Sequence, residues 1–309
     1  MIASIFSKTR PINYLVIGLT SLLFFSIYQF NDTKWLTDGW QIFYKVLVLL
    51  TLFASFVLLN RLVLVNNLTK INNYAILLFA IFILFFPSIF KNQNVIISNF
   101  FLLLALNRLL ALHHLKSTKE KIFDASFWIL IAALFHFWCI SYILLVFIAI
   151  IFHVAGDYRN WIIPFLALFA VTILAFLTDL ILDNNLLLNI YNEIDYSFKF
   201  SYFENVYQNI SFAIFSSITV LFFYSQIVDL PNKPLNKQTI FKKVLFSFLL
   251  GVLIYVLSNH KNNSYLIYCM APLSILGANF IEKIKTNWMK EITLYLLVVI
   301  AILFFSLQL

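Results

Sequence analysis

Charged residues are scarce in this sequence. Lys, Arg, Asp and Glu together make up 11% of its 309 residues, whereas 62% of the residues are apolar. A soluble domain has about 25% charged residues, because water has to solvate most of its surface. The composition therefore excludes a soluble enzyme or binding module and predicts a protein that lies in a membrane.

Glycine and cysteine are also rare, with five and two residues in the whole chain. Phosphate-cradling loops need several closely spaced glycines, so no such loop is expected. The cysteines, Cys139 and Cys269, both lie in apolar runs, which excludes a disulfide framework and a cysteine-rich metal site. The adjacent His113 and His114 do not have the spacing that places two ligands on one helix face. The sequence thus predicts neither a metal site nor a cofactor.

Long apolar runs dominate what is present. A bilayer core about 30 Å thick is crossed by a helix of about 20 mostly apolar residues. Lipid cannot satisfy free backbone groups, so we expect the runs to form an all-α bundle of transmembrane helices. No cleavage site of small residues follows the first run, which is therefore expected to stay as an anchor. The ten runs are 11–29, 39–65, 72–90, 95–112, 123–154, 161–182, 207–228, 244–258, 264–281 and 292–309.

The run 123–154 is too long for one crossing, because a single helix of about 32 residues would reach roughly 48 Å. A break within 136–139 gives two short helices, and the positive-inside rule decides between one crossing and two. With two crossings, only five of the 21 Lys and Arg residues lie outside, and the other sixteen lie in the cytoplasm. The sequence therefore predicts about eleven crossings, a cytoplasmic N-terminus and a periplasmic C-terminus.

Residues 1–309 are expected to form a single integral membrane domain, multi-pass in the bacterial cytoplasmic (inner) membrane. The segment 183–206 mixes acids with Tyr and Phe and is expected to lie in the outer interface. The formal net charge of +8 arises from the cytoplasmic connections. We attribute it to topology and to contact with membrane lipids rather than to nucleic acid.

Titratable groups gather on the expected outer side, in the first outer loop, near the 136–139 break, in the 183–206 segment and in the SNHKNN loop. Carboxylates near Lys and His at a membrane surface can bind a phosphate-bearing lipid and supply a general base. The candidate residues are Asp32 and Asp38 for catalysis, and His136, Asp195, His260 and Lys261 for substrate binding. Ordinary loop polarity, helix caps and a structural histidine are the alternative interpretations.

Three segments carry a resemblance to known proteins. SIFSKTRPINYL, ALFHFWCISYILL after KIFDASFW, and SNHKNNSYLIYCMAPLSILGANFIE resemble members of an uncharacterised family of inner-membrane proteins from Bacteroidota. This resemblance covers essentially the whole chain and implies a multi-pass inner-membrane protein, without implying an activity.

A second resemblance concerns mechanism. AALFHFW and YLIYCMAPLSI are similar to helices of exopolysaccharide polymerases and of membrane glycosyltransferases that use polyprenyl-phosphate sugars. Those enzymes commonly carry a catalytic Asp in the first outer loop, which by position corresponds to Asp32, with Asp38 as the other candidate. The resemblance implies handling or transfer of a polyprenyl-phosphate-linked sugar at the periplasmic face. A non-catalytic structural or accessory subunit of a membrane complex is the alternative.

Overall fold

A computed structural model describes the chain except for residues 1, 32–33, 183–189, 191–193, 195–205 and 260. The described residues form twelve α-helices and no strand, which confirms the all-α prediction. The helices are α1 (Ile2–Phe6), α2 (Pro11–Gln29), α3 (Gly39–Val65), α4 (Tyr74–Leu84), α5 (Gln93–Leu110), α6 (Thr118–Phe135), α7 (Ile143–His153), α8 (Arg159–Leu182), α10 (Val206–Asp229), α11 (Leu235–Leu257), α12 (Ile267–Lys283) and α13 (Asn287–Leu307).

Eight helices of the described chain are long and apolar enough to cross a membrane. They are α2, α3, α5, α8, α10, α11, α12 and α13, three of them extended by a short 3-10 turn. Two further apolar helices, Tyr74–Leu84 and Phe137–His153, are shorter. These helices are those of a multi-pass membrane protein, and the number of crossings stays a prediction.

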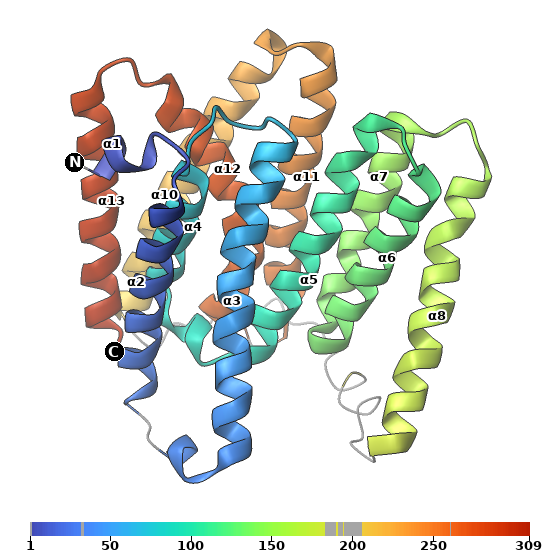
Figure 1. The fold of residues 1–309 in the computed structure, drawn as a ribbon, viewed down its shortest axis with the longest axis horizontal. Coiled ribbons are helices and arrows are strands. Elements are labelled where there is room, and N and C mark those ends of the chain that lie inside the picture. The colour runs from blue at the N-terminus through green and yellow to red at the C-terminus, as the bar shows by residue number, and fades with distance from the viewer. Residues whose placement is uncertain (1, 32–33, 183–189, 191–193, 195–205, 260) are drawn as a thin grey trace.

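The long apolar run breaks at His136. α6 ends at Phe135, and the extended backbone of His136, with φ −151° and ψ 108°, leads into a short 3-10 helix, η4 (Phe137–Tyr142). α7 then packs against α6, and α8 packs against both. Figure 1 shows α7 returning to the end of the bundle at which α6 begins. The chain therefore doubles back at this residue.

The centre of the bundle is formed by α4 and α12. Nine of the 11 residues of α4 and 14 of the 17 residues of α12 are buried. α12 packs against α4, α5, α10 and α11. By contrast, α2, α3 and α8 expose many large apolar side chains, as helices that face lipid do.

Two glycines allow close helix contacts at this centre. A Cβ atom on Gly251 in α11 would lie 2.7 Å from the carbonyl oxygen of Tyr268 in α12. A Cβ atom on Gly277 would lie 2.6 Å from the ring of Phe222 and 2.8 Å from Leu78. Small residues let helices approach closely in membranes, where tight packing replaces the hydrophobic effect as the main attraction.

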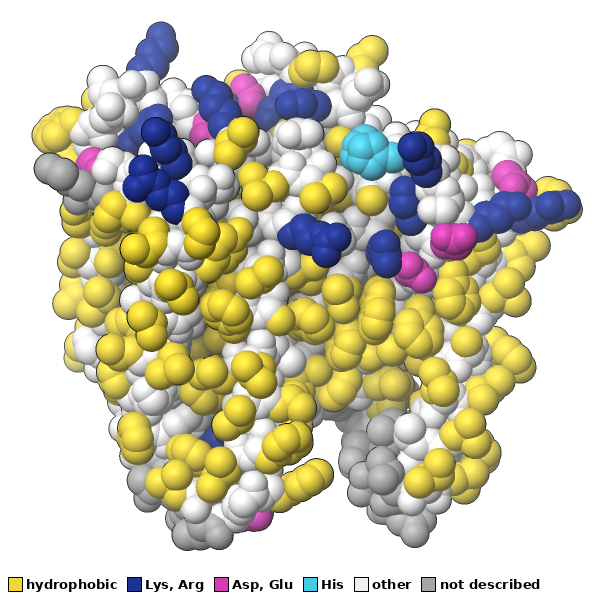
Figure 2. Space-filling model, viewed as in Figure 1, with side chains coloured by type: hydrophobic (Ala, Val, Ile, Leu, Met, Phe, Trp, Pro, Cys, Tyr) yellow, Lys and Arg dark blue, Asp and Glu magenta, His cyan; other side chains and the backbone are white. Residues whose placement is uncertain are grey.

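The charges of the bundle are distributed unevenly. Figure 2 shows Lys and Arg side chains gathered at one end, which we call the basic end, above a broad apolar band. Figure 1 places the N-terminus at this end, together with the connections α3–α4, α5–α6, α7–α8, α10–α11 and α12–α13. The ion pairs at this end include Arg108 with Asp124 at 3.1 Å and Lys119 with Asp157 at 3.4 Å. We call the other end the opposite end.

Candidate functional site

Three of the six predicted site residues, Asp32, Asp195 and His260, lie outside the described residues. Asp38 is exposed and forms the N-cap of α3, where its carboxylate accepts a hydrogen bond from the backbone N–H of Trp40 at 3.0 Å. Figure 1 shows the α2–α3 connection well apart from the end of α6. The structure therefore does not bring Asp38 together with His136.

His136 is buried at the opposite end, with 5% of its surface exposed. Its Nε2 lies 2.9 Å from the Oγ of Ser258, and this hydroxyl donates to the carbonyl oxygen of Ile254 at 2.6 Å. Both contacts are satisfied when Nε2 carries the proton and donates to Ser258. Burial lowers the pKa of His136 to about 4, so the imidazole is neutral at physiological pH. It therefore acts as a hydrogen-bonding group rather than as a cation.

Two tyrosines stack on this imidazole. The ring centroids of Tyr265 and Tyr268 lie 4.6 and 5.8 Å from that of His136. The hydroxyl of Tyr268 lies 2.6 Å from Ser98 Oγ on α5. The residues of this group come from α5, the α6–η4 junction, the end of α11, the 3-10 helix η6 (Asn263–Leu266) and α12. We call the following five residues the histidine cluster: Ser98, His136, Ser258, Tyr265 and Tyr268.

The connection between α11 and η6 adds further donors. Lys261 is only 2% exposed, and burial lowers the pKa of its ammonium group. Asn263 is 3% exposed, and neither atom of its amide has a hydrogen-bond partner among the described residues. A buried amide without a partner commonly marks the place of a water or a ligand. Lys261 and Asn263 lie in the chain between Ser258 and Tyr265, so the connection that joins these two cluster residues carries a cation and an amide.

An apolar groove lies between α6, η4 and α8. Its volume is about 230 Å³, and its walls include Leu134 and Phe137 on one side and Val171 on the other. Phe137 directly follows His136. The groove has the apolar character that an acyl or isoprenoid chain needs.

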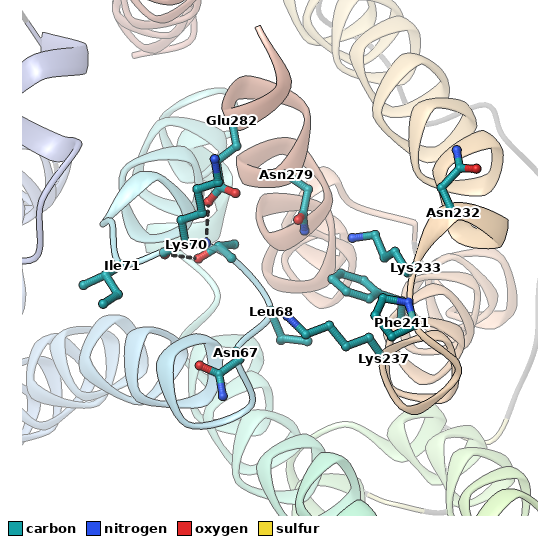
Figure 3. A pocket seen from close by; sticks show the side chains of 12 residues that line it. Asn67, Leu68, Lys70, Ile71, Asn232, Lys233, Lys237, Phe241, Asn279 and Glu282 are labelled. Carbon is teal, nitrogen blue, oxygen red and sulfur yellow. Dashed lines mark hydrogen bonds between the residues drawn. The ribbon is translucent and has the colours of Figure 1, made fainter. Parts of the chain in front are cut away.

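A larger and more polar cavity lies at the basic end, and Figure 3 shows it from close by. Its volume is about 480 Å³. It is formed by the α3–α4 connection, the start of α11 and the end of α12. We call it the basic cavity, and its polar side chains include Asn67, Lys70, Asn232, Lys233, Lys237, Asn279 and Glu282.

The wall formed by the α3–α4 connection is held by hydrogen bonds. Asn67 has a positive φ of 49°, a conformation that Asn tolerates better than most residues. The backbone N–H groups of Asn67 and Leu68 donate to the carbonyl oxygens of Leu64 and Val63, at 3.2 and 3.0 Å. These bonds form a Schellman motif that ends α3. The Glu282 carboxylate then accepts from the backbone N–H of Lys70 at 2.8 Å and ties the connection to α12.

Two cations come from the chain just before α11 and from its first turn. In Figure 3 the ammonium groups of Lys233, which precedes α11, and of Lys237, on α11, point toward Asn279 and Leu68. Lys233 Nζ lies 3.4 Å from the centroid of the Phe241 ring and 3.6 Å from the Asp229 carboxylate. Burial lowers the pKa of Lys233 to about 8, an effect that Asp229 partly opposes. The ammonium group of Lys237 forms no ion pair with any residue that the structure describes.

Sequence reasoning did not find the basic cavity. It counted Lys70, Lys233 and Lys237 only as cytoplasmic charges, because they belong to segments far apart in the chain. No spacing rule connects these segments, which meet only through the packing of α12 against α4 and α11.

Buried apolar helices with cations collected at one end define the chain as a multi-pass α-helical membrane protein. It belongs to a family of unknown function, DUF6427, whose family model matches residues 1–309. No curated protein and no solved structure matches the chain.

Proposed function

We propose that the protein handles or transfers a polyprenyl-phosphate-linked sugar at the periplasmic face of the bacterial inner membrane. The observation that carries this proposal is the buried Lys261 in the connection between Ser258 and Tyr265, two residues of the histidine cluster. Ammonium, hydroxyl and amide groups are donors, and together they suit a phosphate. The positive-inside rule assigns the opposite end, where this group lies, to the periplasm.

Each part of the site has a proposed task. Lys261 and Asn263 hold the phosphate, and the neutral His136 positions Ser258 through its hydrogen bond. The groove at Phe137 takes the first isoprene units of the lipid. His260 and Asp195, which lie outside the described residues, are proposed to bind the substrate, as the sequence predicts.

A transfer reaction also needs a general base. Asp32 is proposed for this task, with Asp38 as the second candidate. The carboxylate takes the proton of the acceptor hydroxyl, the hydroxyl oxygen bonds to the anomeric carbon, and the polyprenyl phosphate leaves with the electrons of the broken bond. Asp38 would have to release the N–H of Trp40 and approach the histidine cluster, because the α2–α3 connection lies well apart from the end of α6.

Lipid analysis of purified protein tests the proposal. The wild type, Lys261→Ala and the control Lys91→Ala are purified in mild detergent, and bound polyprenyl phosphates are quantified by mass spectrometry. Lys91 is an exposed lysine at the end of the 3-10 helix η2 (Pro87–Phe90). We expect lipid with the wild type and the control, and roughly tenfold less with Lys261→Ala, as for a lost charged contact. No polyprenyl lipid on the wild type, or equal amounts on all three folded proteins, contradicts the proposal.

The accessory-subunit alternative is favoured by one observation, the use of the Asp38 carboxylate as a helix cap. A capping carboxylate needs no catalytic explanation. Under this alternative the same purification yields a protein partner in a fixed ratio and no polyprenyl lipid.

A further inference from the structure

We propose that the basic cavity is a second binding site, which takes a phosphate group presented by an anionic phospholipid or by a soluble phosphate compound. This site lies at the basic end, whereas the proposed sugar-lipid site lies at the opposite end. The inference therefore does not depend on the proposed function.

The first argument is charge. Around the basic cavity lie four lysines, Lys70, Lys233, Lys237 and Lys283, and two carboxylates, Asp229 and Glu282, among the residues that the structure describes. Asp229 is shared, at 3.6 Å from Lys233 and 3.1 Å from Lys283. Four cations and two carboxylates leave an excess of two positive charges, which an anion would neutralise.

The second argument is enclosure. Lys233 is held between the Phe241 ring and Asp229, with only 15% of its side chain exposed. A half-enclosed ammonium group is attracted to an anion more strongly than an exposed lysine, because fewer water molecules screen it. The cavity of about 480 Å³ thus has one ammonium group, that of Lys233, already held in position at its wall.

The third argument is location. The basic cavity lies where helices end, and the positive-inside rule assigns this end to the cytoplasmic headgroups. Basic pockets between transmembrane helices on the cytoplasmic side take anionic headgroups. Leu68 and Ile71 belong to its lining, and Ile71 is 75% exposed. The exposed Ile71 side chain offers an apolar margin to the glycerol and the first methylenes of a lipid, whereas Leu68 is buried.

Binding to the detergent-purified full chain tests the proposal, with three probes. Dioctanoyl phosphatidylglycerol carries phosphate and tails, dioctanoylglycerol carries the same tails without phosphate, and inorganic phosphate has no tails. Affinities are measured for the wild type, for Lys233→Gln/Lys237→Gln and for the control Lys116→Gln/Lys285→Gln. The control removes the same charge from exposed lysines in connections outside the cavity lining.

We expect the wild type to prefer phosphatidylglycerol to dioctanoylglycerol, and the cavity variant to lose this affinity at least about tenfold. The control should change it by less than about twofold, because exposed charges are screened. Comparable binding of inorganic phosphate identifies a soluble compound as the ligand, and binding of phosphatidylglycerol alone identifies a lipid. Equal binding of both lipids, or an equal loss in the control, overturns the proposal.

The pH dependence supplies a second readout. Lys233 has a pKa of about 8, set by its burial, by Asp229 on α10, by Lys283 on α12 and by Lys237 on α11. The phosphodiester does not titrate near this pH. Affinity should therefore fall between about pH 7 and about pH 9 as Lys233 loses its proton, and Lys233→Arg should remove this fall because Arg stays charged. A fall that persists in Lys233→Arg contradicts the part assigned to Lys233.

Discussion

Lys243 is a charged residue with a structural role, because it binds the carbonyl groups at the end of a neighbouring helix. Its side chain is fully buried inside the bundle, on α11. The ammonium group donates to the carbonyl oxygens of Leu109 and Leu110, at 2.7 and 3.3 Å. These are the last residues of α5, where carbonyl groups lack partners and a cation is favourable. Lys243 therefore closes the end of a neighbouring helix, in addition to its contribution to the charge bias of the loops.

Replacing Lys243 by Ala should destabilise the protein. The carbonyl oxygen of Leu109 loses the Lys243 donor, that of Leu110 keeps only its bond to His113 Nδ1, and a cavity remains in the bundle. We expect a loss of about 2 kcal/mol or more, measured by thermal unfolding in detergent. The matched control is Lys242→Ala, which removes the neighbouring lysine and should change stability by less than about 0.5 kcal/mol. Equal stability of the two variants would show that the contacts of Lys243 do not support the fold.

Among the helices, the contact between α11 and α12 links the fold to the proposed sugar-lipid site. Gly251 lets the two backbones meet at Tyr268. Tyr268 in turn stacks on His136 and bonds to Ser98. A displacement of α12 relative to α11 would therefore move the histidine cluster as well as the core.

Gly251→Ala should be destabilising for this reason. The added methyl group would lie 2.7 Å from a backbone oxygen, which cannot turn aside as a flexible side chain can. Overpacking of this kind costs about 1–3 kcal/mol, and the midpoint of thermal unfolding measures it. Gly156→Ala is the control, because a Cβ atom there has no neighbour within 4 Å. If Gly251→Ala were as stable as this control, the close contact between α11 and α12 would not contribute to the stability of the fold.

For the whole molecule, the open question is which end faces the cytoplasm. The basic end should do so, because Lys and Arg are retained in cytoplasmic connections. Reporter enzymes that are active only in the periplasm, fused after Lys237, Asn192 and Asp157, test this. The fusion after Asn192 should be active, and those after Lys237 and Asp157 should be inactive. Asp157 follows α7 and lies at the same end as Lys237. Activity after both of these residues, with no activity after Asn192, would place the basic end in the periplasm and overturn the predicted topology.

Local composition was sufficient for the class of protein, for the approximate position of most helices and for a break within 136–139. Apolar content and run length are properties of short segments, and a run too long for one crossing has to bend or tilt. A titratable residue among Phe135, Phe137 and Trp138 is costly in such a run, so the sequence indicates a special role for His136. The candidate ligand Lys261 also followed from the sequence, as a rare cation among the outer connections.

The hydrogen-bond partner of His136, the burial of Lys243 and the basic cavity depend on contacts between segments that are distant in the sequence. The partner of His136 is Ser258, 122 residues further along the chain, and no periodicity connects the two. Lys243 and Lys233 belong to the same basic stretch of sequence, yet packing buries one among helix ends and places the other at a cavity. The basic cavity exists because α12 packs against α4 and α11 at once. Hydropathy and charge are read one segment at a time, whereas burial and the choice of partner depend on which helices become neighbours.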